Sequence, residues 1–452
     1  MRRTFVLLVL AVGLLVRVAP ASALDIQEVV SPGGVRAWLV EDHSNPILTL
    51  SFSFVGGESS DPAGKEGRAR LVSGLLDEGA GDLDSATFQQ ALTDNSITLR
   101  FNSRIDRFSG RLVTLTETRD TAVELLRLAL VEPRFDPEPV ERIRAQIQAS
   151  IRSDLQNPRS IASRAWWGAS FAGHPYGRSG DGTLESVAAV TADDLEGFVD
   201  ATFARDGLVV SAVGDIDAAT LAGLLDTVFG GLPEAGTVAA APDTSPQAVG
   251  ETVVVPVPVP QSVVVFGHAG IGRDDPDWYA ASLLNEIMAG GFGSRLTEEI
   301  REKRGLVYGV YAYLLPLDHA ALVMGGLATQ NARVAESIGI LRQEWQRMAE
   351  EGPTAEELAD ARTYLLGSFP LRLVDSDGTA GTLMALQEAG LPIDYLDRRA
   401  ALFQAVTLDD LRRVARRLYR PEQLTVVVVG MPDGVAATVP VPPVPGVPSG
   451  GG

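Results

Sequence analysis

The chain alternates between two hydrophobic patterns. Short apolar runs bounded by polar or turn residues are typical of strands, and longer stretches with apolar residues three and four apart are typical of helices. The runs predict strands at residues 47–55, 97–102, 111–116, 263–266, 306–315 and 320–325. The longer stretches predict helices at residues 118–131, 139–155, 331–351 and 354–368. Runs of strands with helices to one side indicate an α+β fold.

One helix-and-strand pattern occurs twice. Residues 190–214 and 406–430 align without a gap, and nine of the 25 positions are identical. In each copy a threonine (Thr191, Thr407) precedes two aspartates, which predicts an N-cap and a favourable charge at the start of a helix. An apolar run ended by glycine follows and predicts a buried strand. A single fixed offset of this size indicates duplication of a large domain, giving two homologous domains in tandem.

Composition marks the domain boundaries. Residues 233–250 are rich in Pro, Ala, Gly, Ser and Thr and are interpreted as a linker. The first domain is therefore placed at residues 24–232 and the second at 251–435. Residues 436–452 form a Pro/Gly/Val-rich tail that is expected to be disordered.

The N-terminus predicts export. Arg2 and Arg3 are followed by an apolar run at residues 5–16 and by the small residues 21–23, which together are typical of a secretory signal peptide at residues 1–23. The alternative, a membrane anchor, needs roughly 20 apolar residues, and this run is ended by Arg17. We therefore expect an exported, soluble and periplasmic protein, with no membrane contact after signal removal.

Charge and composition exclude several classes of function. The chain of 452 residues has 38 Lys+Arg against 58 Asp+Glu, a net charge of −20, which disfavours nucleic-acid binding. The absence of cysteine excludes disulfides, thiol catalysis and zinc–thiolate sites. No two of the four histidines have the i, i+4 spacing of a helical zinc motif. His43, His174 and His319 are interpreted as loop or turn residues. His268 is interpreted as a hydrogen-bonded residue at the end of a strand, with a hydrogen bond to a ligand as the alternative.

The segment 290–308 is the densest in candidate functional residues. Its glycines precede a predicted helix with Glu early and Arg or Lys late, and Gly305 is a plausible helix stop. Arg301 would then lie on the last turn and Tyr308 on the following strand, where the guanidinium and the phenol could converge on one carbonyl. The alternative is a capped helix end beside a packed strand tyrosine.

At this segment the chain resembles the pitrilysin/insulinase-type zinc metallopeptidase family, which includes the mitochondrial processing peptidase. The resemblance rests on residues 294–308 and extends to residues 61–67, 174–178 and 190–214. It implies two homologous α/β-sandwich domains in tandem, which pair with a second such unit to form a clamshell. It also implies that Arg301 and Tyr308 are the family's catalytic Arg and Tyr, and that the neighbouring residues Gly290, Gly291, Ser294 and Arg295 bind substrate.

The chain departs from the family at the zinc site. Aligned on residues 61–65, the family's His-x-x-Glu-His motif falls on Arg70, Ser73 and Gly74, and the distal Glu ligand falls at Ala149 or Ser150. No metal ligand remains, so no metal or other cofactor is expected in this chain.

The resemblance therefore implies a non-catalytic subunit of a heterodimeric zinc endopeptidase that is inactive alone. Its partner would be a homologous subunit that carries His-x-x-Glu-His and zinc, and its substrate a peptide or unfolded protein. The alternative is a catalytically inactive peptide-binding or scaffold protein of the same fold.

Overall fold

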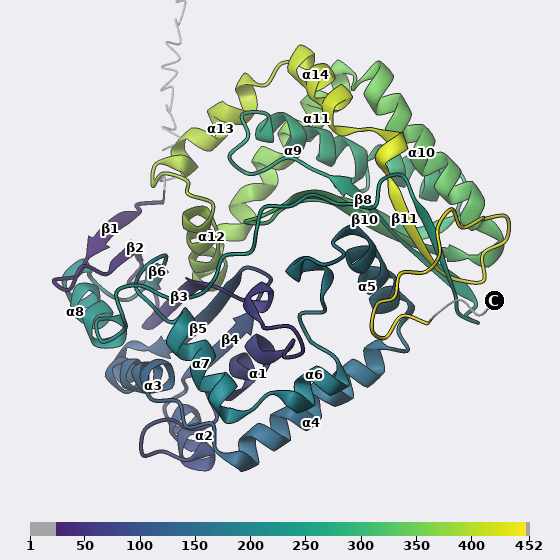
Figure 1. Ribbon diagram of the computed structural model, residues 1–452. Coiled ribbons are helices and arrows are strands. Elements are labelled where there is room, and N and C mark those ends of the chain that lie inside the picture. The colour runs from purple at the N-terminus through teal and green to yellow at the C-terminus, as the bar shows by residue number, and fades with distance from the viewer. Residues whose placement is uncertain (1–23, 449–452) are drawn as a thin grey trace, which may run out of the picture.

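The computed structural model describes residues 24–448, so the expected signal peptide at residues 1–23 lies outside the described residues. Two mixed sheets form its centre, and helices cover them (Figure 1). The α+β class and the tandem arrangement expected from the sequence are confirmed. Within residues 24–448, no helix is long and apolar enough to cross a membrane.

The first half builds a six-stranded sheet in the order β1-β2-β6-β3-β5-β4. Its strands are β1 (Gln27–Val30), β2 (Arg36–Glu41), β3 (Ile47–Val55), β4 (Thr98–Ser103), β5 (Arg107–Leu115) and β6 (Val209–Gly214). Its helices are α1 (Arg68–Leu75), α2 (Ser85–Asp94), α3 (Arg119–Val131), α4 (Pro137–Asp154), α5 (Pro158–Ser170), α6 (Leu184–Ala189), α7 (Ala192–Thr202) and α8 (Ala218–Phe229). Strand β3 is central, antiparallel to both β5 and β6, and its residues Leu48, Leu50, Phe52 and Phe54 are fully buried in the core of this half.

The second half builds a five-stranded sheet in the order β7-β11-β8-β10-β9. Its strands are β7 (Thr252–Pro256), β8 (Gln261–Ala269), β9 (Val307–Pro316), β10 (Ala321–Gln330) and β11 (Thr425–Gly430). Its helices are α9 (Trp278–Ala289), α10 (Val334–Glu351), α11 (Ala355–Ser368), α12 (Ser376–Glu388), α13 (Tyr395–Ala405) and α14 (Leu408–Leu418). Thr191 and Thr407 begin α7 and α14 with matching capping boxes, which confirms the N-caps expected from the repeat.

The two halves exchange helices. Helix α5 of the first half packs on β8 and β11, and α12 of the second half packs on β3 and β6 (Figure 1). The face of β3 under α12 carries small hydroxyl residues, and Thr49 Oγ1 lies 3.1 Å from Ser376 Oγ. Because these side chains are small, α12 approaches the sheet closely. Each sheet is therefore packed against a helix from the other half.

The segment after β11 also packs against the rest of the chain. The N–H of Thr438 donates to the carbonyl of Thr252 at 2.8 Å, and Val439, Val441 and Val447 pack on the cluster around α5. Residues 436–448 therefore differ from the disordered tail expected from composition, because their valines find an apolar surface between the halves.

Candidate functional site

The positions that correspond to the family's zinc motif lie on α1, which packs against α4. Arg70 and Gly74 are one helical turn apart and line a cavity of about 170 Å3. The other lining residues are Ile143, Gln146, Ile147, Ser150 and Asp181. Ser150 is one of the two α4 positions expected to replace the distal ligand. The residue types do not fit zinc, and within residues 24–448 no group of three or more His, Cys, Asp or Glu could hold a metal ion.

The side chains in this cavity explain why it cannot do the family's chemistry. Arg70 brings a positive charge of its own, and its Nε lies 3.6 Å from Oδ1 of Asp181. Ser73, at the position of the general base, is buried and donates its hydroxyl to the carbonyl of Arg70 at 2.8 Å. A Cβ at Gly74 would stand 3.0 Å from a methyl of Ile143, so a larger side chain there would require Ile143 to move.

The segment before α1 fixes the start of this helix. The buried carboxylate of Asp61 accepts hydrogen bonds from the N–H groups of Gly67 (3.0 Å) and Ala69 (3.1 Å). Gly67 has a φ of +92°, and a Cβ there would meet Val187 and a backbone carbonyl. The residues that carried the resemblance at positions 61–67 therefore orient α1.

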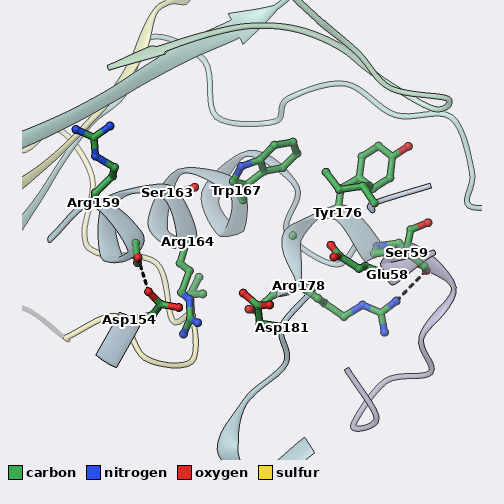
Figure 2. Close-up of a pocket in the computed structure, with 17 residues that line it drawn as sticks. Glu58, Ser59, Asp154, Arg159, Ser163, Arg164, Trp167, Tyr176, Arg178 and Asp181 are labelled. Atoms are coloured by element: carbon green, nitrogen blue, oxygen red, sulfur yellow. Dashed lines mark hydrogen bonds between the residues drawn. The ribbon is translucent and has the colours of Figure 1, made fainter. Parts of the chain in front are cut away.

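A second cavity, of about 350 Å3, shares Asp181 with the first (Figure 2). Trp167 and Arg159 of α5 lie on one side of it, and Glu58 and Arg178 on the other (Figure 2). Burial raises the pKa of Glu58 to about 7, with a smaller contribution from the negative charge of Asp181. Glu58 therefore changes charge near neutral pH.

Most residues of this second cavity could not be found from sequence. Glu58 and Asp181 are far apart in the chain, and no spacing motif joins them. Only the segment 174–178 gave a signal, through the family resemblance. In the structure His174 accepts from the N–H of Tyr176 at 3.1 Å and caps the short helix η3 (Pro175–Gly177).

The glycine-rich stretch of the second half divides into an exposed part and a buried part. Gly290 is exposed and Gly291 half-buried, beside Phe292. Ser294 is buried, and its hydroxyl donates to the carbonyl of Gly291 at 2.7 Å.

Arg295 is also buried and is held by an ion pair. Its guanidinium donates to Glu357 (Nη2–Oε2, 2.8 Å) and to the carbonyl of Gly352 (2.9 Å). Arg295 therefore anchors the stretch to α11, whereas the hydroxyl of Ser294 is bonded within the stretch itself.

The structure brings Arg301 and Tyr308 together. Arg301 lies on the π-helix η4 (Thr297–Glu302), and its Cζ is 5.7 Å from the ring centroid of Tyr308. The same Cζ is also 5.1 Å from the ring of Phe292, which the sequence did not single out. Phe292 is 80% exposed and Tyr308 93% exposed. A half-buried guanidinium thus contacts two solvent-facing rings.

An irregularity in the edge strand accompanies this arrangement. Val307 pairs with Thr329 and Val310 pairs with Leu327, so the register shifts at Tyr308 and the residue that follows it. Such a bulge re-aims side chains at a sheet edge. Val307 and Val310 both remain buried while Tyr308 faces solvent.

The four histidines do not converge. His268 is fully enclosed: its Nδ1 lies 2.8 Å from the carbonyl of Ala269, and its Nε2 accepts from the indole N–H of Trp345 at 3.0 Å. Burial lowers the pKa of His268 to about 4, so the ring is neutral. His319 lies in the β9–β10 turn, as expected, with Nδ1 3.0 Å from Asp243.

Comparison with known proteins extends over almost the whole chain. Residues 189–365 match the family model described as "Peptidase M16 inactive domain". The "Non-peptidase homolog YmxG" of Helicobacter pylori is 27% identical over 410 residues, which cover 90% of this chain and 94% of that protein. The "Uncharacterized zinc protease SCO5738" of Streptomyces coelicolor is 26% identical over 406 residues, 86% of each chain.

Solved structures give the same result. A peptidase M16 inactive domain from Pseudomonas fluorescens superposes with a TM-score of 0.84 at 27% identity, covering 92% of this chain and 100% of that one. A protease from Helicobacter pylori superposes with a TM-score of 0.81 over 90% of this chain and 100% of that one. At 17% identity, the second match carries the fold alone.

Proposed function

We propose that this chain, a non-catalytic relative of the M16 peptidases, is the substrate-binding and transition-state-stabilising subunit of a heterodimeric zinc endopeptidase. The observation that carries the proposal is the contact of Arg301 with the exposed rings of both Phe292 and Tyr308. An arginine with a purely structural role would be expected to form an ion pair with a carboxylate. Arg301 has only Glu302, at 3.5 Å, and the structure gives its guanidinium no hydrogen bond within residues 24–448.

The arrangement suits an anionic oxygen. A guanidinium is a fixed fork of donors, and a phenol adds one further O–H donor. When water attacks a peptide carbonyl, negative charge grows on the carbonyl oxygen, and donors already in place stabilise that state. The two rings hold the guanidinium by cation–π contact and so reduce the rearrangement needed when substrate arrives.

The remainder of the machinery must come from another chain. Arg70, Ser73 and Gly74 supply neither ligands nor a base, so we assign zinc and His-x-x-Glu-His to a homologous partner subunit. Peptide would bind between the two subunits, with Gly290 and the half-buried Gly291 allowing its backbone to approach. Following the sequence, we assign the complex to the periplasm.

Substitution of Arg301 in the assembled complex tests this proposal. Arg301→Ala and Tyr308→Phe are each expected to lower kcat by roughly 100-fold with little change in KM, because the lost donor acts in the transition state. Arg304→Ala is the matched control, since Arg304 lies three residues further and is held by Glu299 at 2.7 Å. Unchanged turnover in the Arg301→Ala complex would leave only a peptide-binding or scaffold role.

A further inference from the structure

A large cavity lies where the two halves meet, away from Arg301 and from the degenerate zinc site. It has a volume of about 1140 Å3 and is bordered by the β4–β5 connection, the end of β9, and helices α9, α11, α12 and α13. Five arginines line it: Arg104, Arg107, Arg273, Arg372 and Arg399. Four carboxylates also line it: Asp106, Asp274, Asp318 and Glu388. In a chain of net charge −20, this cavity has a formal surplus of one positive charge.

The arginines fall into two groups. Arg104 is paired with Glu388, and Arg107 with Asp318 at 3.4 Å. Arg273, Arg372 and Arg399 have no ion pair with any residue in the range 24–448. We call these three the open arginines.

Aromatic rings hold two of the open arginines. The Cζ of Arg273 is 4.9 Å from the ring of Trp278 and 5.4 Å from that of Tyr395. The Cζ of Arg399 is 4.0 Å from the ring of Phe369. These cation–π contacts stabilise the two positive charges without pairing either of them with a carboxylate.

Most donors of the open arginines therefore remain available. Among the described residues, Arg399 Nη2 donates to the carbonyl of Leu365 at 3.2 Å. A guanidinium carries five N–H donors. Burial lowers the pKa of Arg399, and the positive charge of Arg372 nearby adds to this effect. An anion bound here would offset both the burial of the Arg399 charge and its repulsion by Arg372.

We propose that the cavity binds a monoanionic carboxylate carried on an apolar body, with the carboxylate received by the open arginines. The surplus of one positive charge matches one carboxylate, whereas a phosphate dianion would leave excess negative charge beside Asp318 and Glu388. Leucines 314, 315, 386 and 391 line the same space and suit the apolar body. The volume suffices for a ligand of drug size or slightly larger. This site needs neither Arg301 nor a partner subunit.

Two sources share this chemistry, a free apolar carboxylic acid and the C-terminal end of a peptide. Isothermal titration of the mature full chain distinguishes them with two probes, 4-phenylbutyrate and N-acetyl-Leu-Leu-Phe, each compared with its amide. We expect at least one acid to bind saturably and its amide to bind at least tenfold more weakly. Tighter binding of the tripeptide acid would identify a peptide end, and tighter or equal binding of 4-phenylbutyrate would identify a free acid.

Variants then locate the site. Arg372→Gln and Arg273→Gln are each expected to weaken the acid roughly tenfold or more, as loss of a charge-assisted hydrogen bond does. Arg398→Gln is the matched control, because Arg398 lies on the same helix as Arg399 and faces solvent beside Asp394. Arg301→Ala should bind the acid as the wild type does, which separates this site from the proposed function.

Three results would overturn the proposal. They are the absence of saturable binding of either acid at millimolar concentration, equal affinity for an acid and its amide, and unchanged affinity in a folded Arg372→Gln protein. Arg372 is exposed, so that variant is expected to fold, and circular dichroism verifies it.

Discussion

The hydroxyl of Tyr176 lies 2.8 Å from both carboxylate oxygens of Asp106 and donates to this carboxylate inside the protein. The second half completes the network: the N–H of Asp318 donates to Asp106 (3.1 Å), and the N–H of His319 donates to the Tyr176 oxygen (3.1 Å). Burial and the adjacent carboxylate raise the pKa of Tyr176. The two halves are therefore joined by a satisfied polar network as well as by exchanged helices.

Removing this hydroxyl should destabilise the protein. Tyr176→Phe leaves a buried carboxylate short of a donor, which costs about 1–3 kcal/mol. Urea unfolding followed by circular dichroism measures the loss. Tyr364→Phe on the exposed face of α11 is the control and should be neutral, since Tyr364 is 54% exposed. Equal stability of the two variants would contradict a structural role for the network.

The exchanged helices imply that neither half is stable alone. A fragment of residues 24–250 lacks α12 and would expose Trp38, Val40 and Val213, which now pack against α12 residues such as Leu383. Separate fragments 24–250 and 251–452 are expected to aggregate, and co-expression should restore a soluble pair. Cooperative thermal unfolding of either monomeric fragment alone would contradict this.

Glu58 should make stability fall as pH rises toward neutrality. Its pKa is about 7 in the folded protein, above its ordinary value of 4.5, so the folded state holds the proton more tightly. The resulting stabilisation is complete below pH 4.5 and is lost as pH rises through 7, an amount on the order of 3 kcal/mol.

Glu58→Gln should remove this pH dependence, and Asp181→Asn should shift it to lower pH by removing the neighbouring negative charge. The measurement is the free energy of unfolding between pH 4.5 and 8 for the three proteins. Parallel curves for wild type and Glu58→Gln would show that Glu58 is ionised normally.

His268 acts in the opposite direction. Its pKa is lowered to about 4 by burial, below its ordinary 6.5, so protonation favours the unfolded chain. The stabilisation is present above pH 6.5 and is lost as pH falls toward 4, roughly 3 kcal/mol. The difference in unfolding free energy between wild type and His268→Gln should shrink over this range, whereas a difference independent of pH would argue against a neutral buried ring.

Much of the fold could be predicted from periodicity. Residues 47–55 were predicted as a strand and form β3, and the predicted helices of the first half lie within two residues of α3 and α4. The similarity to the pitrilysin/insulinase-type peptidases expected from the sequence is confirmed by the M16 matches. These features depend on local spacing or on motifs.

The exchange of α5 and α12 could not be predicted, because the apolar pattern of a helix does not show which of two sheets the helix covers. Local spacing did predict that Arg301 and Tyr308 could converge, but it gave no sign of Phe292 as their third member. The burial of Arg295 could not be predicted from the motif, because its partner Glu357 is 62 residues away in the sequence. The raised pKa of Glu58 likewise arises from burial and from the charge of Asp181, which is far away in the sequence.

The most direct test of the central claim is to isolate the native protein and identify what co-purifies in stoichiometric amount. The account predicts a homologous partner of similar size that carries His-x-x-Glu-His, with one zinc per pair. A zinc-free chain, alone or paired only with itself, would contradict it.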